Sequence, residues 1–148
     1  MAERFYFDDL HVGQRFTSAT HRMTAEAIKE FAAQFDPQPF HLDEEAAAAS
    51  LFGGLVASGW HTAAVTMRLL VEGGAPIAGG VIGAGGVVAW PRPTRPEDEL
   101  QVVSEVTAVT PSRSKPDRGI VVVRSETRNQ RGEVVQIMTS KLVVPRRT

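Results

Sequence analysis

The chain has 148 residues, of which 43% are hydrophobic and 22% are charged, proportions typical of a globular domain and not of a disordered, collagenous or coiled-coil protein. Its 16 Lys and Arg and 17 Asp and Glu residues give a net charge of −1, without the basic excess of proteins that bind nucleic acid or membrane surfaces. Because the chain has no cysteine, disulfides, thiolate nucleophiles and iron–sulfur clusters are excluded. We therefore expect one domain over residues 1–148.

The sequence also indicates no contact with a membrane. It contains no apolar run close to the ~20 residues that a membrane span requires. Residues 1–10 lack the apolar stretch of a signal peptide. We expect a cytoplasmic location and no membrane or nucleic-acid partner.

The first predicted elements are a strand near residues 15–20 and a helix over residues 25–35. Apolar side chains recur in the second segment at the i, i+3, i+4, i+7 spacing of one helix face: Ile28, Phe31, Ala32 and Phe35. Thr24 is a typical N-cap, and Pro37 and Pro39 end the helix. This pattern is typical of an amphipathic helix.

Two further helices are predicted before the middle of the chain. Asp43 can cap a short helix through residues 46–49. A longer helix follows, in which apolar side chains again recur at helical spacing: Trp60, Ala63, Ala64, Met67 and Val71. With Leu69 and Leu70 beside them, this helix is apolar around much of its circumference, so we expect it to be buried. It should end at Gly73–Gly74.

The second half of the chain changes to the pattern of strands, rich in Val, Ile and Thr. The predicted strands cover residues 81–90, 100–109, 120–128 and 133–144. Residues 129–132 form the turn of a hairpin, and residues 91–96 form a bend between two strands. Strands that follow one another through short turns imply an antiparallel sheet, with the long helix on one face. The predicted fold class is therefore α+β.

A glycine-rich segment at residues 79–86 invites a dinucleotide-binding interpretation, which the sequence excludes. Val88 stands where the third glycine of that motif is required, and the segment leads into a strand and not into a helix. Glycine in a strand allows a close approach of neighbouring backbone. We therefore expect a strand packed tightly on the long helix.

Asp36 and His41 are the first candidates for chemistry. They lie five residues apart in a segment that two prolines keep out of a helix, and a curled loop would bring both to one substrate. An aspartate and a histidine suit general acid–base catalysis, because their pKa values bracket weakly acidic to neutral pH. The ordinary alternative is an aspartate that only turns the chain and a histidine at the start of a helix.

A second candidate is the run of small residues before the long helix, residues 53–59. Small residues at a helix start let backbone N–H groups meet an anion or a polarised carbonyl, although they also serve close packing and loop flexibility. His41 and His61 lie 20 residues apart without acidic partners at a metal-binding spacing, so no metal site is predicted.

Together the two segments resemble the MaoC-type dehydratases, the (R)-specific enoyl-CoA hydratases of the hotdog fold. The family loop D-x-N-P-[LIV]-H-x-D is matched by residues 36–43, and the family segment F-x-x-x-I-x-H-G by residues 52–59. Gln38 and Ser58 stand where the family usually has Asn and His. The resemblance implies a long central helix wrapped by an antiparallel sheet. It also implies a homodimer or higher homo-oligomer, with the acyl tunnel at the subunit interface.

The resemblance further implies roles for individual residues. Asp36 and His41 would act on the water molecule and on the proton of the α-carbon. The N–H of Gly59 would polarise the thioester carbonyl, and the Ser58 hydroxyl would offer a hydrogen bond beside it. Three aromatic side chains flank these groups and are predicted to contact the substrate: Phe40, Phe52 and Trp60.

The expected function is the reversible addition of water to the α,β double bond of an enoyl thioester, most simply enoyl-CoA, with no cofactor beyond the CoA of the substrate. One alternative is a hotdog acyl-CoA thioesterase, although no Asp or Glu lies between Trp60 and Leu70 to act on a water at the carbonyl. Another is a non-catalytic acyl-thioester-binding subunit, which the presence of both Asp36 and His41 disfavours.

Overall fold

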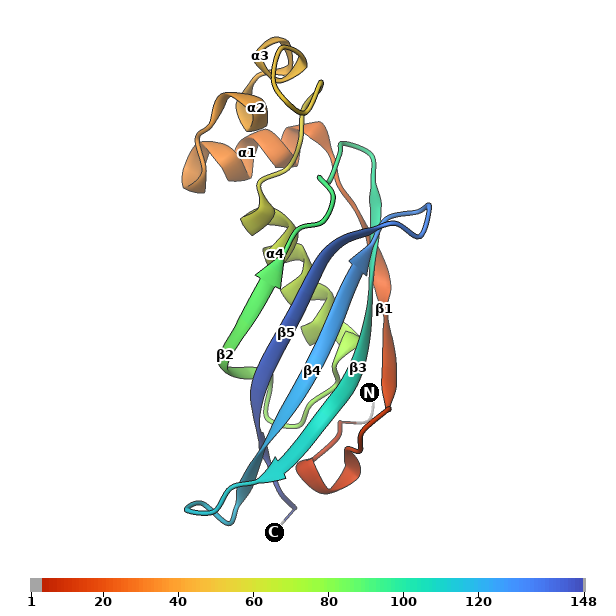
Figure 1. Ribbon diagram of the computed structural model, residues 1–148, viewed down its shortest axis with the longest axis vertical. Helices are drawn as coiled ribbons and strands as arrows, with labels where there is room; N and C mark the ends of the chain where they lie inside the picture. Colours follow the sequence, from red (N-terminus) through yellow and green to blue (C-terminus); the bar gives the residue numbers. More distant parts are fainter. Residues whose placement is uncertain (1–3, 148) are drawn as a thin grey trace.

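The computed structural model describes residues 4–147, which form one antiparallel sheet with helices on one face and beyond one end (Figure 1). The sheet has five strands in the order β1-β3-β4-β5-β2. Their bounds are Arg15–Arg22 for β1, Ile82–Ala89 for β2, Glu99–Pro111 for β3, Arg118–Arg128 for β4 and Val134–Pro145 for β5. The predicted α+β class and the antiparallel pairing are confirmed.

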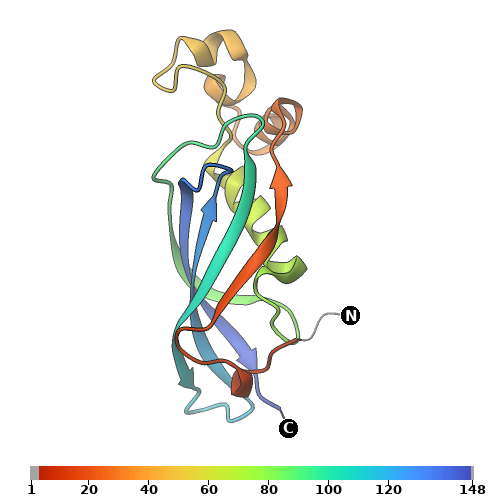
Figure 2. The ribbon, with the colours of Figure 1, turned by 90° about the vertical axis from the view of Figure 1, so that its right-hand side faces the viewer.

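A 3-10 helical turn, Phe7–Asp9, precedes β1, and the α-helices lie between β1 and β2 in the chain. Their bounds are Ala25–Phe35 for α1, Pro39–Leu42 for α2, Glu44–Ala48 for α3 and Gly59–Leu69 for α4, which continues as a π-helical turn over Leu70–Gly74. α4 crosses one face of the sheet, whereas α1, α2 and α3 gather beyond the end of the sheet, near the start of α4 (Figure 1, Figure 2). Within residues 4–147, no helix is long and apolar enough to cross a membrane.

The predicted helix caps are confirmed, and one apolar position differs. The Thr24 hydroxyl oxygen accepts the N–H three residues later at 3.1 Å, and an Asp43 carboxylate oxygen does the same at 2.9 Å. Ile28 and Ala32 of α1 are fully buried, but Phe35 is 68% exposed. The last residue of the predicted apolar stripe leaves the core because the end of α1 extends beyond the sheet (Figure 1).

The interface between α4 and the sheet combines an apolar core with a buried polar network. The apolar side chains of the sheet alternate along β3 and β4, and include Leu100, Val102, Val106, Val121 and Val123. Gln136 of β5 is fully buried and donates a hydrogen bond to the Thr66 hydroxyl of α4 at 3.1 Å. That hydroxyl also lies 2.6 Å from the hydroxyl of Thr127 on β4. Because these buried polar groups are paired, the network fixes α4 on the sheet.

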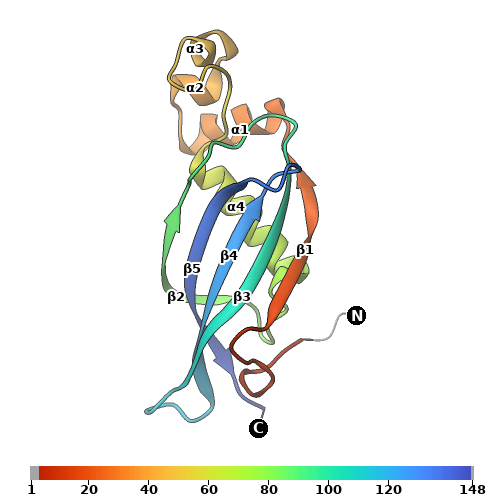
Figure 3. The same ribbon diagram turned by 45° about the vertical axis from the view of Figure 1, so that its right-hand side comes forward.

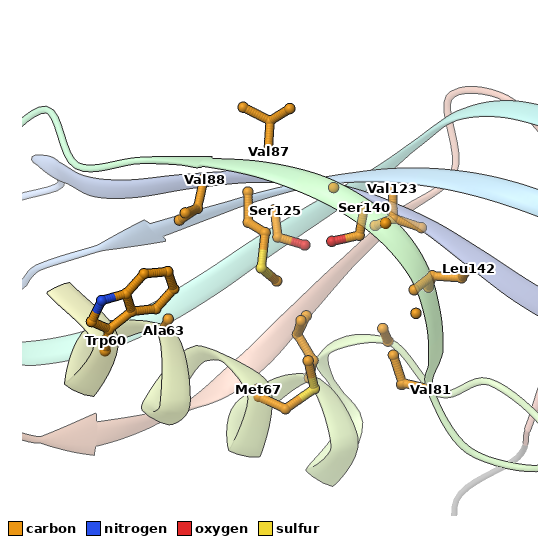
Figure 4. Close-up of a pocket in the computed structure, with 16 residues that line it drawn as sticks. Trp60, Ala63, Met67, Val81, Val87, Val88, Val123, Ser125, Ser140 and Leu142 are labelled. Atoms are coloured by element: carbon orange, nitrogen blue, oxygen red, sulfur yellow. The ribbon is translucent and has the colours of Figure 1, made fainter. Parts of the chain in front are cut away.

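The glycine-rich strand β2 does not pack tightly on α4, contrary to the prediction. β2 is an edge strand bonded to β5, and Val87 is 73% exposed. A cavity of about 410 Å³ separates β2 from α4 (Figure 4). The glycines serve the pairing with β5 instead. A Cβ on Gly86 would lie 2.7 Å from the carbonyl oxygen of Thr139, and the register shifts between Gly83 and Gly85.

Residues 91–96 are more than the predicted bend between two strands. β4 and β5 separate β2 from β3, so this segment crosses over one end of the sheet (Figure 3). It passes the start of α4, where the Thr94 carbonyl accepts the N–H of Ala57 at 2.9 Å. The Thr94 hydroxyl accepts a hydrogen bond from Thr62 of α4 at 3.0 Å. The segment is therefore tied to the helix start that the sequence singled out.

Candidate active site

Asp36 and His41 are brought together by the end of α1 and by the short helix α2. Asp36 is the C-cap of α1, and Pro39 begins α2, where its missing N–H is not needed. The predicted non-helical loop is therefore wrong in part: α2 is a single helical turn, and it carries His41 back toward Asp36. The carboxylate Oδ2 and the imidazole Nε2 lie 3.3 Å apart.

The imidazole of His41 is oriented by a backbone carbonyl. Its ring is buried, and Nδ1 lies 2.6 Å from the carbonyl oxygen of Val56. Because a carbonyl oxygen can only accept, Nδ1 carries a hydrogen, and Nε2 is the nitrogen that gains or loses a proton. The exchangeable nitrogen therefore faces Asp36.

Two side chains donate hydrogen bonds to the carboxylate of Asp36. Gln38 Nε2 lies 2.5 Å from Oδ1, and the Ser58 hydroxyl lies 2.7 Å from Oδ2. Burial alone would raise the pKa of Asp36, but these two hydrogen bonds and the nearby His41 outweigh burial and hold that pKa below its usual value. Asp36 is therefore an ionised and fixed acceptor at neutral pH.

Ser58 and Gly59 form the start of α4. The Ser58 oxygen accepts the N–H of Trp60 at 3.2 Å and so caps the helix, while its hydroxyl donates to Asp36. Among residues 4–147, the N–H of Gly59 has no hydrogen-bond acceptor, as expected at the first position of a helix. A Cβ on Gly59 would lie 2.6 Å from the indole ring of Trp90, so the ring leaves room for glycine alone.

A cavity of about 480 Å³ opens beside these groups. Six of the seven site residues predicted from the sequence line it: Asp36, Phe40, His41, Phe52, Gly59 and Trp60. Ser58 does not line it, because its side chain is fully buried next to Asp36. The structure thus gathers all seven residues at one place, and their roles in catalysis stay predictions.

The segment that crosses the end of the sheet adds residues that the sequence did not indicate. Trp90, Arg92 and Thr94 also line the cavity. The ring of Trp90 meets that of Trp60 edge to face at 5.2 Å, and its Nε1–H donates to Gln136 at 2.9 Å. No local pattern indicates these contacts, because the partners of Trp90 lie 30 and 46 residues away in the chain.

His61 lies in the packing between α1 and α4, outside the lining of this cavity. Its ring stacks on Phe31 at 4.7 Å, and its buried Nδ1 has no hydrogen-bond partner among the described residues. Burial, with a contribution from His21, lowers the pKa of His61 to about 4, so its ring is neutral near pH 7. Across residues 4–147, no three His, Asp or Glu side chains gather as a metal site.

Comparisons with known proteins agree on the family. Residues 9–129 match the family described as MaoC like domain. The crystal structure of a MaoC-like dehydratase from Rhodospirillum rubrum is 65% identical, with a TM-score of 0.96 over 97% of this chain and 99% of the other. The R-hydratase PhaJ1 from Pseudomonas aeruginosa is 26% identical, with a TM-score of 0.79 over 97% of this chain and 88% of the other. The uncharacterized protein YdeM of Bacillus subtilis (strain 168) is 35% identical over 127 residues, 84% of this chain and 87% of that protein.

The helix α4 on its five-stranded antiparallel sheet is the hotdog fold of these relatives, as the sequence resemblance implied. The Asp–His pair beside the start of α4 lies within the matched region. The chain belongs to the MaoC-like domain family. It is therefore a member of a hydratase/dehydratase family.

Proposed function

We propose that this protein adds water reversibly to the double bond of an enoyl thioester, with CoA as the carrier. The observation that carries the proposal is the pairing of Asp36 with His41 at 3.3 Å, in a cavity that Gly59 also lines. Hydration of a conjugated thioester needs a proton acceptor, a proton donor and a fixed dipole at the carbonyl oxygen. These three kinds of group lie together here.

The proposed addition conserves protons. A water O–H bond breaks, the oxygen bonds to the β-carbon, and the released proton passes to the Asp36–His41 pair. The pair returns one proton to the α-carbon, so the enzyme ends as it began. Asp36 is held ionised for this exchange by its two donors, and His41 exchanges its proton at Nε2.

The start of α4 supports the carbonyl side of the reaction. As water adds to the β-carbon, negative charge develops on the thioester oxygen. The N–H of Gly59, which has no acceptor among the described residues, and the helix dipole are placed to stabilise that charge, and losing one such donor typically raises the barrier by about 3–4 kcal/mol. Ser58 orients Asp36 in this proposal and does not act on the carbonyl, because its hydroxyl hydrogen is already donated to the carboxylate.

The region formed by α4 and β2 is the proposed binding place of the acyl group and of the partner subunit. Trp60 lines both the catalytic cavity and the cavity between α4 and β2, so the two cavities are neighbours, and we assign the acyl chain to the second. Large apolar side chains are exposed on α4, on the π-helical turn that follows it and on β2: Trp60, Met67, Val71, Ile82 and Val87. Exposed apolar patches and an unpaired strand edge are typical of subunit interfaces, which supports the homodimer implied by the family resemblance.

The two alternative functions have less support. A thioesterase needs a carboxylate on the central helix, and residues 59–69 contain none. A non-catalytic binder of acyl thioesters has no need of an Asp36 carboxylate clamped beside His41. The cytoplasmic location and the lack of a cofactor beyond CoA stay predictions.

The test follows the loss of the conjugated double bond of crotonyl-CoA. We expect hydration by the wild type and a loss of about 10²–10⁴-fold in Asp36→Asn, with the fold retained by circular dichroism. Asp117→Asn is the control, because it changes an exposed aspartate in the turn between β3 and β4, and this turn lies at the opposite end of the sheet from α1, α2 and α3 (Figure 1).

Each outcome of this assay has a distinct meaning. Wild-type activity in Asp36→Asn contradicts the mechanism. Release of free CoA without hydration favours the thioesterase. Tight binding of acyl-CoA without turnover of any enoyl chain favours the binding subunit.

A further inference from the structure

The cavity between α4 and β2 contains two hydroxyl groups that the hydration step does not use. Its lining side chains are aliphatic, aromatic or thioether groups, with the exception of two serines, Ser125 on β4 and Ser140 on β5. Figure 4 shows their oxygen atoms pointing toward one another from the two strands, across the cavity from Met67 of α4. A purely apolar acyl chain would meet these hydroxyls on one side of its path.

The two serines lie on the same face of the sheet and keep free hydrogen-bonding capacity. In the register of β4 and β5, Ser125 lies opposite Met138, two residues from Ser140, so the serines are diagonal neighbours. Ser125 is buried, and its hydroxyl shares a hydrogen bond of 3.0 Å with Ser104. The Ser140 hydroxyl has no hydrogen-bond partner among residues 4–147. Because a hydroxyl donates once and accepts twice, both serines can still bind a ligand oxygen.

The bare backbone of β2 keeps the Ser140 hydroxyl accessible. Gly86 lies beside Ser140, and a Cβ on Gly86 would lie 3.5 Å from the hydroxyl oxygen. Two other glycines that line the cavity from β2, Gly83 and Gly85, also have no side chain to fill the space. The hydroxyl therefore faces a volume that a ligand can occupy.

The two serines lie at a depth that an acyl chain bound at Gly59 would reach. The ring of Trp60, which lines both cavities, meets Trp90 just beyond the end of β2. In the sheet register, Ser125 lies level with a β2 residue two positions before Trp90, and Ser140 lies level with a β2 residue four positions before it. At the usual rise of a strand, these positions are roughly 7 and 13 Å from Trp90. The chain would therefore pass the serines several atoms beyond its β-carbon.

We propose that the acyl group of the substrate carries an oxygen beyond its β-carbon, as a hydroxyl, an ether or a ketone, which hydrogen-bonds to Ser140 and Ser125. This inference rests on the proposed function and names the substrate class of the same site. A plain alkyl chain covers the Ser140 hydroxyl and leaves it unpaired, which lowers affinity by about 10-fold or more. An oxygen at that depth pairs with the hydroxyl instead.

The test compares pairs of CoA thioesters of equal length. In each pair one acyl chain is unbranched dodecanoyl, which is long enough when extended to reach the level of Ser140, and the other has an ether oxygen in place of one methylene, moved along the chain from pair to pair. Titration calorimetry gives the dissociation constants of the saturated chains, and loss of the conjugated double bond gives kcat/KM for the corresponding enoyl chains. For one oxygen position, we expect the wild type to prefer the ether chain over the unbranched chain by about 10-fold, both in dissociation constant and in kcat/KM. In Ser140→Ala, the two chains should give nearly equal values.

Two further variants make the comparison specific. Thr139→Ala is the matched control, because Thr139 is next to Ser140 on β5 and its side chain points to the other face of the sheet. Its preference for the oxygenated chain should equal that of the wild type. Ser125→Ala should weaken the preference less than Ser140→Ala, because Ser104 already engages the Ser125 hydroxyl.

The outcomes separate this inference from the proposed function. Hydration without a preference for any oxygenated chain, or a preference that survives in Ser140→Ala, overturns the inference and leaves the proposed function standing. A preference in calorimetry without hydration of any enoyl chain overturns the proposed function and supports the serine subsite. No binding of either chain overturns both.

Discussion

The cavity at Asp36 and the cavity between α4 and β2 differ in how their polar groups are held. Asp36 accepts hydrogen bonds from two side chains, and His41 is oriented by a backbone carbonyl. In the second cavity the strand edge is unpaired, glycines replace side chains and the Ser140 hydroxyl is free among the described residues. Fixed groups favour one reaction geometry, whereas free groups leave room for ligand recognition. Trp60 lies between the two and belongs to both.

The largest effect on catalysis should follow the loss of His41 Nε2, which faces Asp36 in the first cavity. His41→Gln keeps a hydrogen-bond donor near the Val56 carbonyl and removes the imidazole Nε2 that faces Asp36. We expect kcat for crotonyl-CoA to fall about 10²–10⁴-fold, with a smaller change in KM. His11→Gln, at an exposed histidine, is the control and should be active. Near-normal kcat in His41→Gln would show that the imidazole transfers no proton.

A pair of glycine variants compares the packing of the two cavities directly. Gly59→Ala places a Cβ within 2.6 Å of the Trp90 ring, so it should lower the free energy of unfolding by about 1–3 kcal/mol and kcat/KM by about 10-fold or more. Gly83→Ala in β2 meets no atom within 4 Å and should unfold at nearly the wild-type urea concentration. Equal losses of stability in the two variants would contradict the contrast between a tight and an open cavity.

A smaller effect should come from loosening one donor to Asp36. The groups facing this carboxylate are Ser58, Gln38 and His41. Ser58→Ala removes a donor to the charged form, so the pKa of Asp36 rises and the acid limb of the kcat/KM profile moves to higher pH. At neutral pH the rate should fall about 10-fold, because a hydrogen bond to a charged group is lost. Ser58→Thr keeps a hydroxyl, so its acid limb should lie at the wild-type pH. If the acid limb of Ser58→Ala does not move, Ser58 does not lower the pKa of Asp36.

The smallest effect concerns His61, whose Nδ1 has no partner in the part of the chain that the structure describes, unlike the well-paired groups near the first cavity. Its folded pKa of about 4 is below the ordinary 6.5, so the unfolded chain binds the proton first as pH falls. Above pH 6.5 His61 does not lower the free energy of unfolding. As pH falls from 6.5 toward 4, protonation of the unfolded chain lowers that free energy by roughly 3 kcal/mol at most. Urea unfolding from pH 7 to 4 should show this decline in the wild type and a flatter one in His61→Leu. Equal slopes would contradict it.

The candidate catalytic groups of the first cavity could be predicted from the sequence because they lie in two short segments, whereas the lining from residues 90–94 could not. Residues 36–43 and 52–59 carry the motif spacing that brings Asp36, His41 and Gly59 to one place. The partners that hold them were not predictable. Ser58 was expected beside the thioester and donates instead to Asp36, 22 residues away, which depends on how α1 and α4 cross.

The sequence by itself determined the ends of α1, the strand-forming segments and the Asp–His pair, because capping, periodicity and motif spacing act over a few residues. Only the tertiary structure decided that β2 lies at the edge of the sheet, that a cavity separates it from α4, and that Trp90 covers Gly59. Strand order and side-chain packing arise from contacts between residues far apart in the chain, and these depend on the neighbours that the fold supplies.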